Sequence, residues 1–258
     1  MYRRAIVLLT CMVMAVSLVG CWGKSSHFNP AMSRDFFPLN PDSVWTYRVQ
    51  SKSQRTTYVV TDKVIGLKYV PSLNVTGQVV EEYYNMDRGG TRPIVYLTKG
   101  GYWTRLSGLD YSKDDIQAPA WGRSEEGQFM PAVLMPDLNW SSKIYPFGHM
   151  PGSFDIKQSH RTFFETEDVV VPAGRFSGCM RIETAALYEG GSYAKIGKQL
   201  RLTYEDYYAP HVGLVKTLAL EGAANGPEME RVELLRFAGA SKTAATGVPA
   251  TGQDQAQK

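Results

Sequence analysis

The sequence predicts an all-β protein, built mainly from one large curved antiparallel sheet or half-barrel with long aromatic-rich loops. Short runs of alternating apolar and polar residues recur along the chain, and they are rich in aromatic and β-branched side chains, which favour strands. Glycine and proline lie mainly between these runs, and no long segment keeps the 3.6-residue period of an amphipathic helix. The 258 residues are enough for one medium-sized domain or two small ones.

The first predicted strand, residues 44–49, is the clearest, because Trp45, Tyr47 and Val49 fall on one side of it. Residues 55–65 are expected to pair with it across the turn at residues 51–54. The sequence Asp87-Arg88-Gly89-Gly90 predicts a hairpin turn between the next two strands. The later strands are expected at residues 78–86, 92–97, 102–106, 129–134, 153–171, 179–188, 199–208, 212–219 and 229–237.

Two stretches, residues 107–127 and 135–152, are expected to be longer loops, because they are rich in proline and aromatic residues. Such loops over a curved sheet would either line a cleft or form a lid over the end of the core, and the lid is favoured. The weak candidates for ligand binding are the aromatic residues Trp103, Trp121, Trp140 and Tyr145.

The N-terminal segment has the order of a bacterial export signal. Two arginines, Arg3 and Arg4, precede an uncharged apolar run from Ala5 to Val19, which is shorter than the roughly 20 residues of a membrane-spanning helix. The next residues resemble the lipobox of bacterial lipoproteins, in which a small residue precedes a modified cysteine. They are Leu18, Val19, Gly20 and Cys21.

This resemblance implies that residues 1–20 are a signal peptide, recognised by the peptidase through Leu18, Val19 and Gly20. Cys21 would then carry a diacylglycerol, and the new amino terminus a further chain such as palmitate. Several acyl chains hold a protein on a membrane far better than one. In lipoproteins an aspartate after the cysteine often signals retention at the inner membrane; Trp22 stands there instead, which favours the outer membrane of the bacterial cell envelope. The alternatives are a cut elsewhere or an uncleaved short anchor.

The composition around this signal defines the remaining segments. Residues 21–34 are polar and are expected to form a tether, residues 35–237 the β domain, and residues 238–258 a disordered tail with almost no large apolar side chain. Loss of Arg3 and Arg4 lowers the net charge from +3 to about +1, which argues against nucleic acid as a partner. Cys179 is the cysteine left in the β domain, and it is interpreted as a buried small residue.

Three motifs, in the same order along the chain, resemble segments of uncharacterised bacterial lipoproteins. Phe36-Phe37-Pro38-Leu39 followed by residues 44–47 resembles F-P-L…W-x-Y, residues 171–179 resemble V-P-A-G-x-F…C, and residues 208–215 resemble Y-A-P-x-V-G-L-V. The resemblance implies a curved sheet of the half-barrel kind, akin to periplasmic lipoprotein carriers, and implies no activity. Turn formation and core packing also explain these residues, and this structural interpretation is favoured.

No catalytic, metal or cofactor motif stands out. The histidines His149, His160 and His211 are isolated from one another, and His27 lies in the tether. We therefore expect a non-enzymatic, membrane-anchored envelope lipoprotein that binds an envelope partner or an apolar ligand. One alternative is a periplasm-facing hydrolase of glycan or peptidoglycan that uses Asp110, Asp114, Asp115 or His160. Another is a structural subunit of an outer-membrane assembly.

Overall fold

The computed structural model describes residues 31–52, 54–85, 90–112, 115–118, 124–147, 154–165, 168–190 and 200–239. The chain divides into two units, residues 1–30 and 31–258, and all described residues belong to the second. Every strand pair and apolar cluster described below lies in the second unit, so this unit has a core of its own and is expected to fold by itself. The lipobox residues and most of the predicted tail lie outside the described residues. Within these ranges, no helix combines the length and the apolar character needed to cross a membrane.

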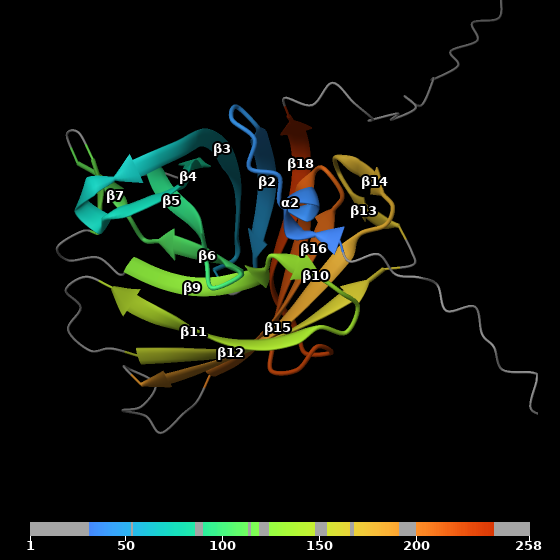
Figure 1. Cartoon of the computed structure of the whole chain (residues 1–258). Coiled ribbons are helices and arrows are strands. Elements are labelled where there is room, and N and C mark those ends of the chain that lie inside the picture. Colours follow the sequence, from blue (N-terminus) through green and yellow to red (C-terminus); the bar gives the residue numbers. More distant parts are fainter. Residues whose placement is uncertain are drawn as a thin grey trace, which may run out of the picture. The chain divides into compact units, whose positions relative to one another are not determined.

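The second unit is built on twelve antiparallel strands that close into a barrel (Figure 1). Each strand pairs with the next barrel strand along the chain, and the last pairs with the first, which is an up-and-down arrangement. The strands are β2 (Val44–Ser51), β3 (Thr56–Val70), β4 (Val75–Asn85), β5 (Gly90–Lys99), β6 (Tyr102–Ser107), β9 (Ser124–Pro131), β11 (Asn139–Phe147), β12 (Phe154–Phe164), β15 (Met180–Gly190), β16 (Leu200–Ala209), β17 (Gly213–Glu221) and β18 (Glu228–Ala238).

The all-β prediction is confirmed, and the sheet closes completely where a half-barrel was expected. For most predicted strands, at least one end lies within one or two residues of the corresponding end of the observed strand. The clearest difference is β11, which falls in the expected loop 135–152. Its Trp140 and Ser142 face into the protein and are buried, but prolines on both sides conceal this strand in the sequence. Pairing with β9 and β12 supplies its backbone hydrogen bonds.

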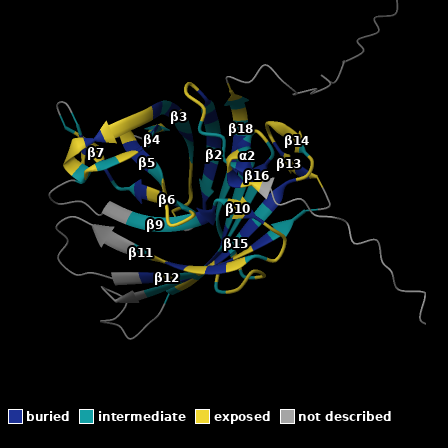
Figure 2. Cartoon of the chain, viewed as in Figure 1, coloured by how far each residue is buried: buried dark blue, intermediate teal, exposed yellow. Residues whose placement is uncertain are grey.

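Of the other predicted loop, residues 124–127 belong to barrel strand β9, and the described residues between 109 and 117 lie on the outside of the barrel. Leu109 and Ile116 pack there with Val79, Val95 and Leu106, side chains on the outward faces of β4, β5 and β6. Strands β7 (Asp110–Tyr111) and β8 (Ile116–Gln117) pair there as a small hairpin, beside the short 3-10 helix η1 (Pro71–Leu73). Leu109 and Ile116 therefore cover an outer face of the barrel. Figure 2 shows the mixture of buried and exposed residues along these strands.

Residues 33–39, here called the N-terminal plug, lie across one end of the barrel. They comprise the short helix α2 (Ser33–Phe36) and the following turn, and β1 (Ala31–Met32) pairs with β10 (Val133–Leu134) just before them. Phe36 is buried with Met180 and Tyr208 on β15 and β16. Phe37 contacts Tyr96 on β5 at a ring-centre distance of 5.0 Å. Contacts with strands far apart around the barrel fix this segment, so part of the predicted tether belongs to the fold.

The motifs that carried the resemblance gather at this same end. Trp45 Nε1 donates a hydrogen bond to the carbonyl oxygen of Val212 at 2.5 Å, and the Tyr47 hydroxyl donates to that of Leu214 at 3.1 Å. Gly213 has φ +101°, and a Cβ atom there would lie 3.3 Å from Trp45 Nε1. These contacts join the first and the third motif at this end of the barrel.

The V-P-A-G-x-F motif forms a hairpin of β13 (Val169–Val171) and β14 (Gly174–Phe176). Val171 and Cys179 are buried in the same apolar cluster as Trp45. Burial raises the pKa of the Cys179 thiol to about 11, so this residue is a packing residue, as predicted.

Candidate functional site

The barrel encloses a cavity of about 510 Å³, and each of its twelve strands contributes to the lining. Alternate side chains of a strand point to opposite faces, so one of every two residues points inward. A volume of this size falls in the range of small-molecule sites. The cavity is therefore the candidate site, and the side chains of its lining define what it could hold.

Apolar side chains form one part of the lining. Phe37 and Leu39 of the N-terminal plug reach the cavity, together with Trp45 of β2. Phe37 meets Phe129 of β9 at a ring-centre distance of 5.2 Å. The remaining apolar lining residues are Val49, Val60, Val80, Ile144, Leu214 and Val232. This part offers a surface that an apolar chain would bury favourably.

Tyrosine is the commonest aromatic residue of the lining. The hydroxyls of Tyr188 and Tyr204, on neighbouring strands, lie 2.9 Å apart, and the Tyr84 hydroxyl donates a hydrogen bond to Glu82. Each such ring presents an apolar face and a polar tip to a ligand. The tyrosines of the lining are Tyr47, Tyr58, Tyr84, Tyr96, Tyr188, Tyr204 and Tyr208.

Carboxylates outnumber cations among the described residues of the lining. Asp62 on β3 lies directly across from Glu82 on β4, and the other carboxylates are Asp206 and Glu230. Arg105 on β6 is the arginine that faces them, with its Nη2 atom 4.0 Å from Glu82 Oε1. The cavity therefore has a negative charge when these carboxyl groups are ionised.

Burial shifts the titration of two of these groups. It raises the pKa of Asp62 to about 7, with a further rise from the negative charge of Glu82, while Arg105 opposes the shift. It also raises the pKa of Asp206 to about 6, although the Thr217 hydroxyl donates a hydrogen bond to Asp206 Oδ1 at 2.6 Å. Desolvation disfavours the charged form of a carboxyl group. Both groups therefore titrate near neutral pH.

His160 lines the cavity as part of a chain of polar side chains. Its Nε2 atom is 2.8 Å from Ser142 Oγ, and its Nδ1 atom is 2.8 Å from Thr184 Oγ1. Its ring stacks on Trp140 at 4.7 Å, and burial lowers its pKa to about 4. The imidazole is therefore neutral at pH 7. A hydroxyl group from Thr184 takes the place that a carboxylate has in a catalytic triad.

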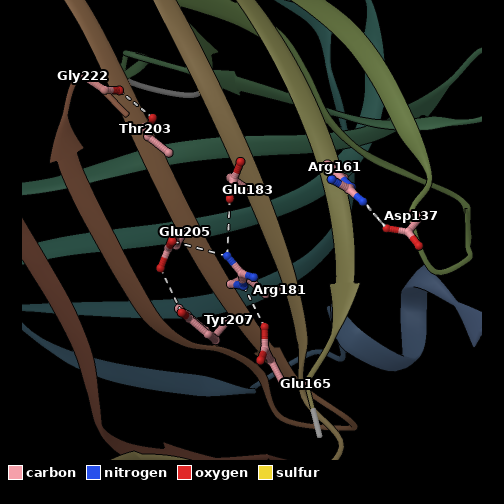
Figure 3. A network of polar contacts seen from close by, with 9 residues as sticks. All are labelled: Asp137, Arg161, Glu165, Arg181, Glu183, Thr203, Glu205, Tyr207 and Gly222. Carbon is pink, nitrogen blue, oxygen red and sulfur yellow. Dashed lines mark hydrogen bonds and ion pairs between the residues drawn. The ribbon is translucent and has the colours of Figure 1, made fainter. Parts of the chain in front are cut away.

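The outward face of the same strands has a different character (Figure 3). Arg181 on β15 contacts Glu165 at 2.7 Å, Glu205 at 3.3 Å and Glu183 at 3.4 Å. The Tyr207 hydroxyl donates a hydrogen bond to the remaining oxygen of Glu205 at 2.9 Å. Each of these carboxylates therefore has an ion-pair partner within the protein. By contrast, Asp62 Oδ1 is buried in the barrel without a hydrogen-bond partner among the described residues.

Of the predicted site residues, His160 lines this cavity, and the structure places the aromatic candidates outside its lining or leaves them undescribed. Trp103 is half-buried, contacts Phe37 at 5.8 Å and donates a hydrogen bond to Ser33 Oγ at 2.9 Å. Trp140 is buried on β11. Trp121 lies outside the described residues, as do Cys21 and the lipobox residues before it, and the side chain of Tyr145 is likewise not described.

The acidic loop predicted as an alternative acid/base source is structural where it is described. Asp115 accepts hydrogen bonds from the backbone amides of Ser72, at 2.9 Å, and Ile116, at 2.8 Å. Asp110 is exposed, and Asp114 lies outside the described residues. In the described part of the chain, no group of three or more histidine, cysteine, aspartate or glutamate side chains is placed to hold a metal ion.

Asp62, Glu82 and Arg105 were not predicted as site residues from the sequence. A signal for the first was present in the strand pattern, because Asp62 occupies the same phase as Val60 and Val64, which face inward. A charged residue at an inward position of a half-buried strand is costly unless it has a role. The same phase connects Val80 with Glu82 on β4. Closure of the barrel, which brings β3, β6 and β16 around one space, left no such local signal.

The fold resembles that of solved bacterial proteins. A candidate lipoprotein from Parabacteroides distasonis aligns with a TM-score of 0.50 and 15% identity, covering 79% of this chain and 98% of that one. A candidate exported protein with a YmcC-like fold from Bacteroides fragilis has a TM-score of 0.46 and 13% identity, covering 78% and 97%. The first likeness shows a shared fold. No protein-family model matches the chain, and no curated protein matches its sequence.

Proposed function

We propose that this chain is a lipid-anchored binding protein of the bacterial cell envelope that holds an apolar or amphipathic ligand inside its barrel and acts without catalysis. The observation that carries the proposal is the cavity of about 510 Å³ to which all twelve strands contribute. Its apolar lining residues, such as Phe37 and Val232, would bury a hydrocarbon chain of the ligand. Its tyrosines and charged groups would contact the polar end of the ligand.

The signal sequence supports the proposed address, and the shared fold with a candidate lipoprotein agrees with it. Cys21 would carry the acyl chains, and Trp22 favours the outer membrane. Replacing the cysteine, Cys21→Ser, is expected to abolish incorporation of labelled palmitate and to move the protein out of the membrane fraction. Unchanged labelling and fractionation would contradict the address and leave the ligand proposal standing.

Ligand binding is tested with the chain from residue 22 to 258 and the apolar fluorophore N-phenyl-1-naphthylamine. We expect saturable fluorescence enhancement, because the dye brightens when it leaves water for an apolar cavity. Ser107 lines the cavity, so Ser107→Trp should fill part of it and weaken binding. Thr57 lies next to the lining residue Tyr58 but is exposed, so Thr57→Trp is the matched control. Equal binding by both variants, or none by the unmodified chain, would refute the cavity as the site.

A hydrolase is the second candidate, and the raised pKa of Asp62 favours it. A carboxyl group that titrates near pH 7 can act as a proton donor, as in glycosidases. Incubation with purified peptidoglycan sacculi, followed by chromatography of the released fragments, separates the two functions. Release that Asp62→Asn abolishes would establish the hydrolase, whereas the binding proposal predicts none. An envelope complex that co-purifies from solubilised membranes without bound ligand would instead support the role as a structural subunit.

A further inference from the structure

Resting on the proposed function, we infer that the cavity selects a ligand whose polar end is a protonated amine, bound by the carboxylates of Asp62 and Glu82. These two side chains lie opposite each other on the paired strands β3 and β4, and both line the cavity. The ligand class is therefore a primary alkylamine or an amphiphile that ends in one.

Asp62 has a hydrogen-bond acceptor that the described residues leave unsatisfied. Asp62 Oδ1 is buried and has no hydrogen-bond partner among the described residues. A buried carboxylate oxygen without a donor costs free energy, which a ligand donor would recover. An ammonium group carries three donors and no acceptor, so it can contact Asp62 and Glu82 at once. A hydroxyl group has one donor and would satisfy fewer of these oxygens.

Acidic side chains outnumber basic ones in the described lining of the cavity. Four carboxyl groups, those of Asp62, Glu82, Asp206 and Glu230, line it together with Arg105. The ion pair of Arg105 with Glu82 is long, at 4.0 Å, and His160 is neutral at pH 7 because burial lowers its pKa to about 4. The described lining therefore has an excess of negative charge, which attracts a cation and repels an anion.

Aromatic rings line the cavity together with the two carboxylates. Tyr58 and Tyr84 lie with their ring centres 6.4 Å apart on β3 and β4, the strands that carry the two carboxylates. Tyr96 on β5 lies directly across from Arg105 on β6. Tyrosine faces attract cations. Carboxylates and aromatic rings in one enclosed space form a site for an organic ammonium group.

The test uses the chain from residue 22 to 258 and measures displacement of N-phenyl-1-naphthylamine by decylamine, decanol and decanoate at pH 8. These probes share one alkyl chain and differ in the charge of the head. We expect decylamine to bind roughly tenfold or more tightly than decanol, because a charge-assisted hydrogen bond has at least that effect. Decanoate should bind most weakly. Asp62→Asn should remove most of the preference for decylamine, and Asp110→Asn, which changes an exposed aspartate, should not alter it.

Arg105→Gln gives the complementary result, since it removes the cation that competes for the same carboxylates. It should tighten decylamine binding and weaken decanoate binding further, and a misfolded variant could not produce such a gain. Equal affinity of all three probes, or looser decylamine binding in Arg105→Gln, would overturn the inference while leaving the ligand-binding function intact. Failure of every probe and of the dye to bind would overturn both.

Discussion

The replacement Asp62→Asn should stabilise the folded protein at pH 8. In the folded state the pKa of Asp62 is raised from 3.8 to about 7, so this state retains the proton over a pH range in which the unfolded chain has lost it. Asp62 therefore lowers stability progressively as pH rises from about 4 through 7. The full difference corresponds to at most about 4 kcal/mol. Because the side chain is partly exposed to the cavity, we expect about 2 kcal/mol after screening.

Urea unfolding followed by tryptophan fluorescence measures this difference at pH 8 and at pH 4. At pH 8 the variant should be more stable by about 2 kcal/mol, which is a rise of about 4–8 °C in Tm for a domain of this size. At pH 4 most of this difference should disappear, because Asp62 is then protonated in the folded state and roughly half protonated in the unfolded chain. Asp110→Asn, at an exposed position, should change little at either pH. A variant that is no more stable than the unmodified chain at pH 8 would refute the assignment of a desolvated carboxyl group.

Three further predictions concern residues around the cavity. His160 is neutral in the fold, with a pKa of about 4. Its contribution to the stability of the fold is therefore complete above pH 6.5 and is lost as the pH falls towards 4. In urea unfolding at a series of pH values, His160→Gln should reduce the loss of stability in acid by roughly 2 kcal/mol. Gly213→Ala should cost about 2 kcal/mol from its positive φ and its contact with Trp45, and more than Gly100→Ala, which has positive φ and open space. Phe37→Ala should lower the free energy of unfolding by about 2 kcal/mol and increase the amount of dye bound. Equal stability of the two glycine variants, or His160→Gln and Phe37→Ala proteins that behave like the unmodified chain, would contradict these roles.

The fold class was predictable because strand patterning is local. The alternation of Trp45, Tyr47 and Val49 can be read without knowing what lies opposite, and the structure places these three side chains in the interior. Strand β11 was not predictable in this way. Its inward residues Trp140 and Ser142 are separated by polar neighbours and bordered by proline, and its stability depends on pairing with β9 and β12. Long-range pairing overrides local preference there.

The candidate site was less predictable than the fold, because its residues come together through barrel closure. Asp62 and Asp206 are 144 positions apart in the numbering, and both line one cavity. The aromatic candidates drew attention by their size, but Trp103 and Trp140 pack into the core instead. The useful signal was a charged residue at an inward position, as for Asp62 between Val60 and Val64. That signal identifies single residues and does not reveal which of them will share a space.

A crystal structure of residues 22–258 grown with 10-bromodecylamine would show whether the interior of the barrel is the ligand site. We expect anomalous bromine density inside the barrel, with the amine nitrogen within hydrogen-bond distance of the Asp62 carboxylate. Bromine density only on the outer faces of the strands, with the interior filled by ordered water, would contradict it.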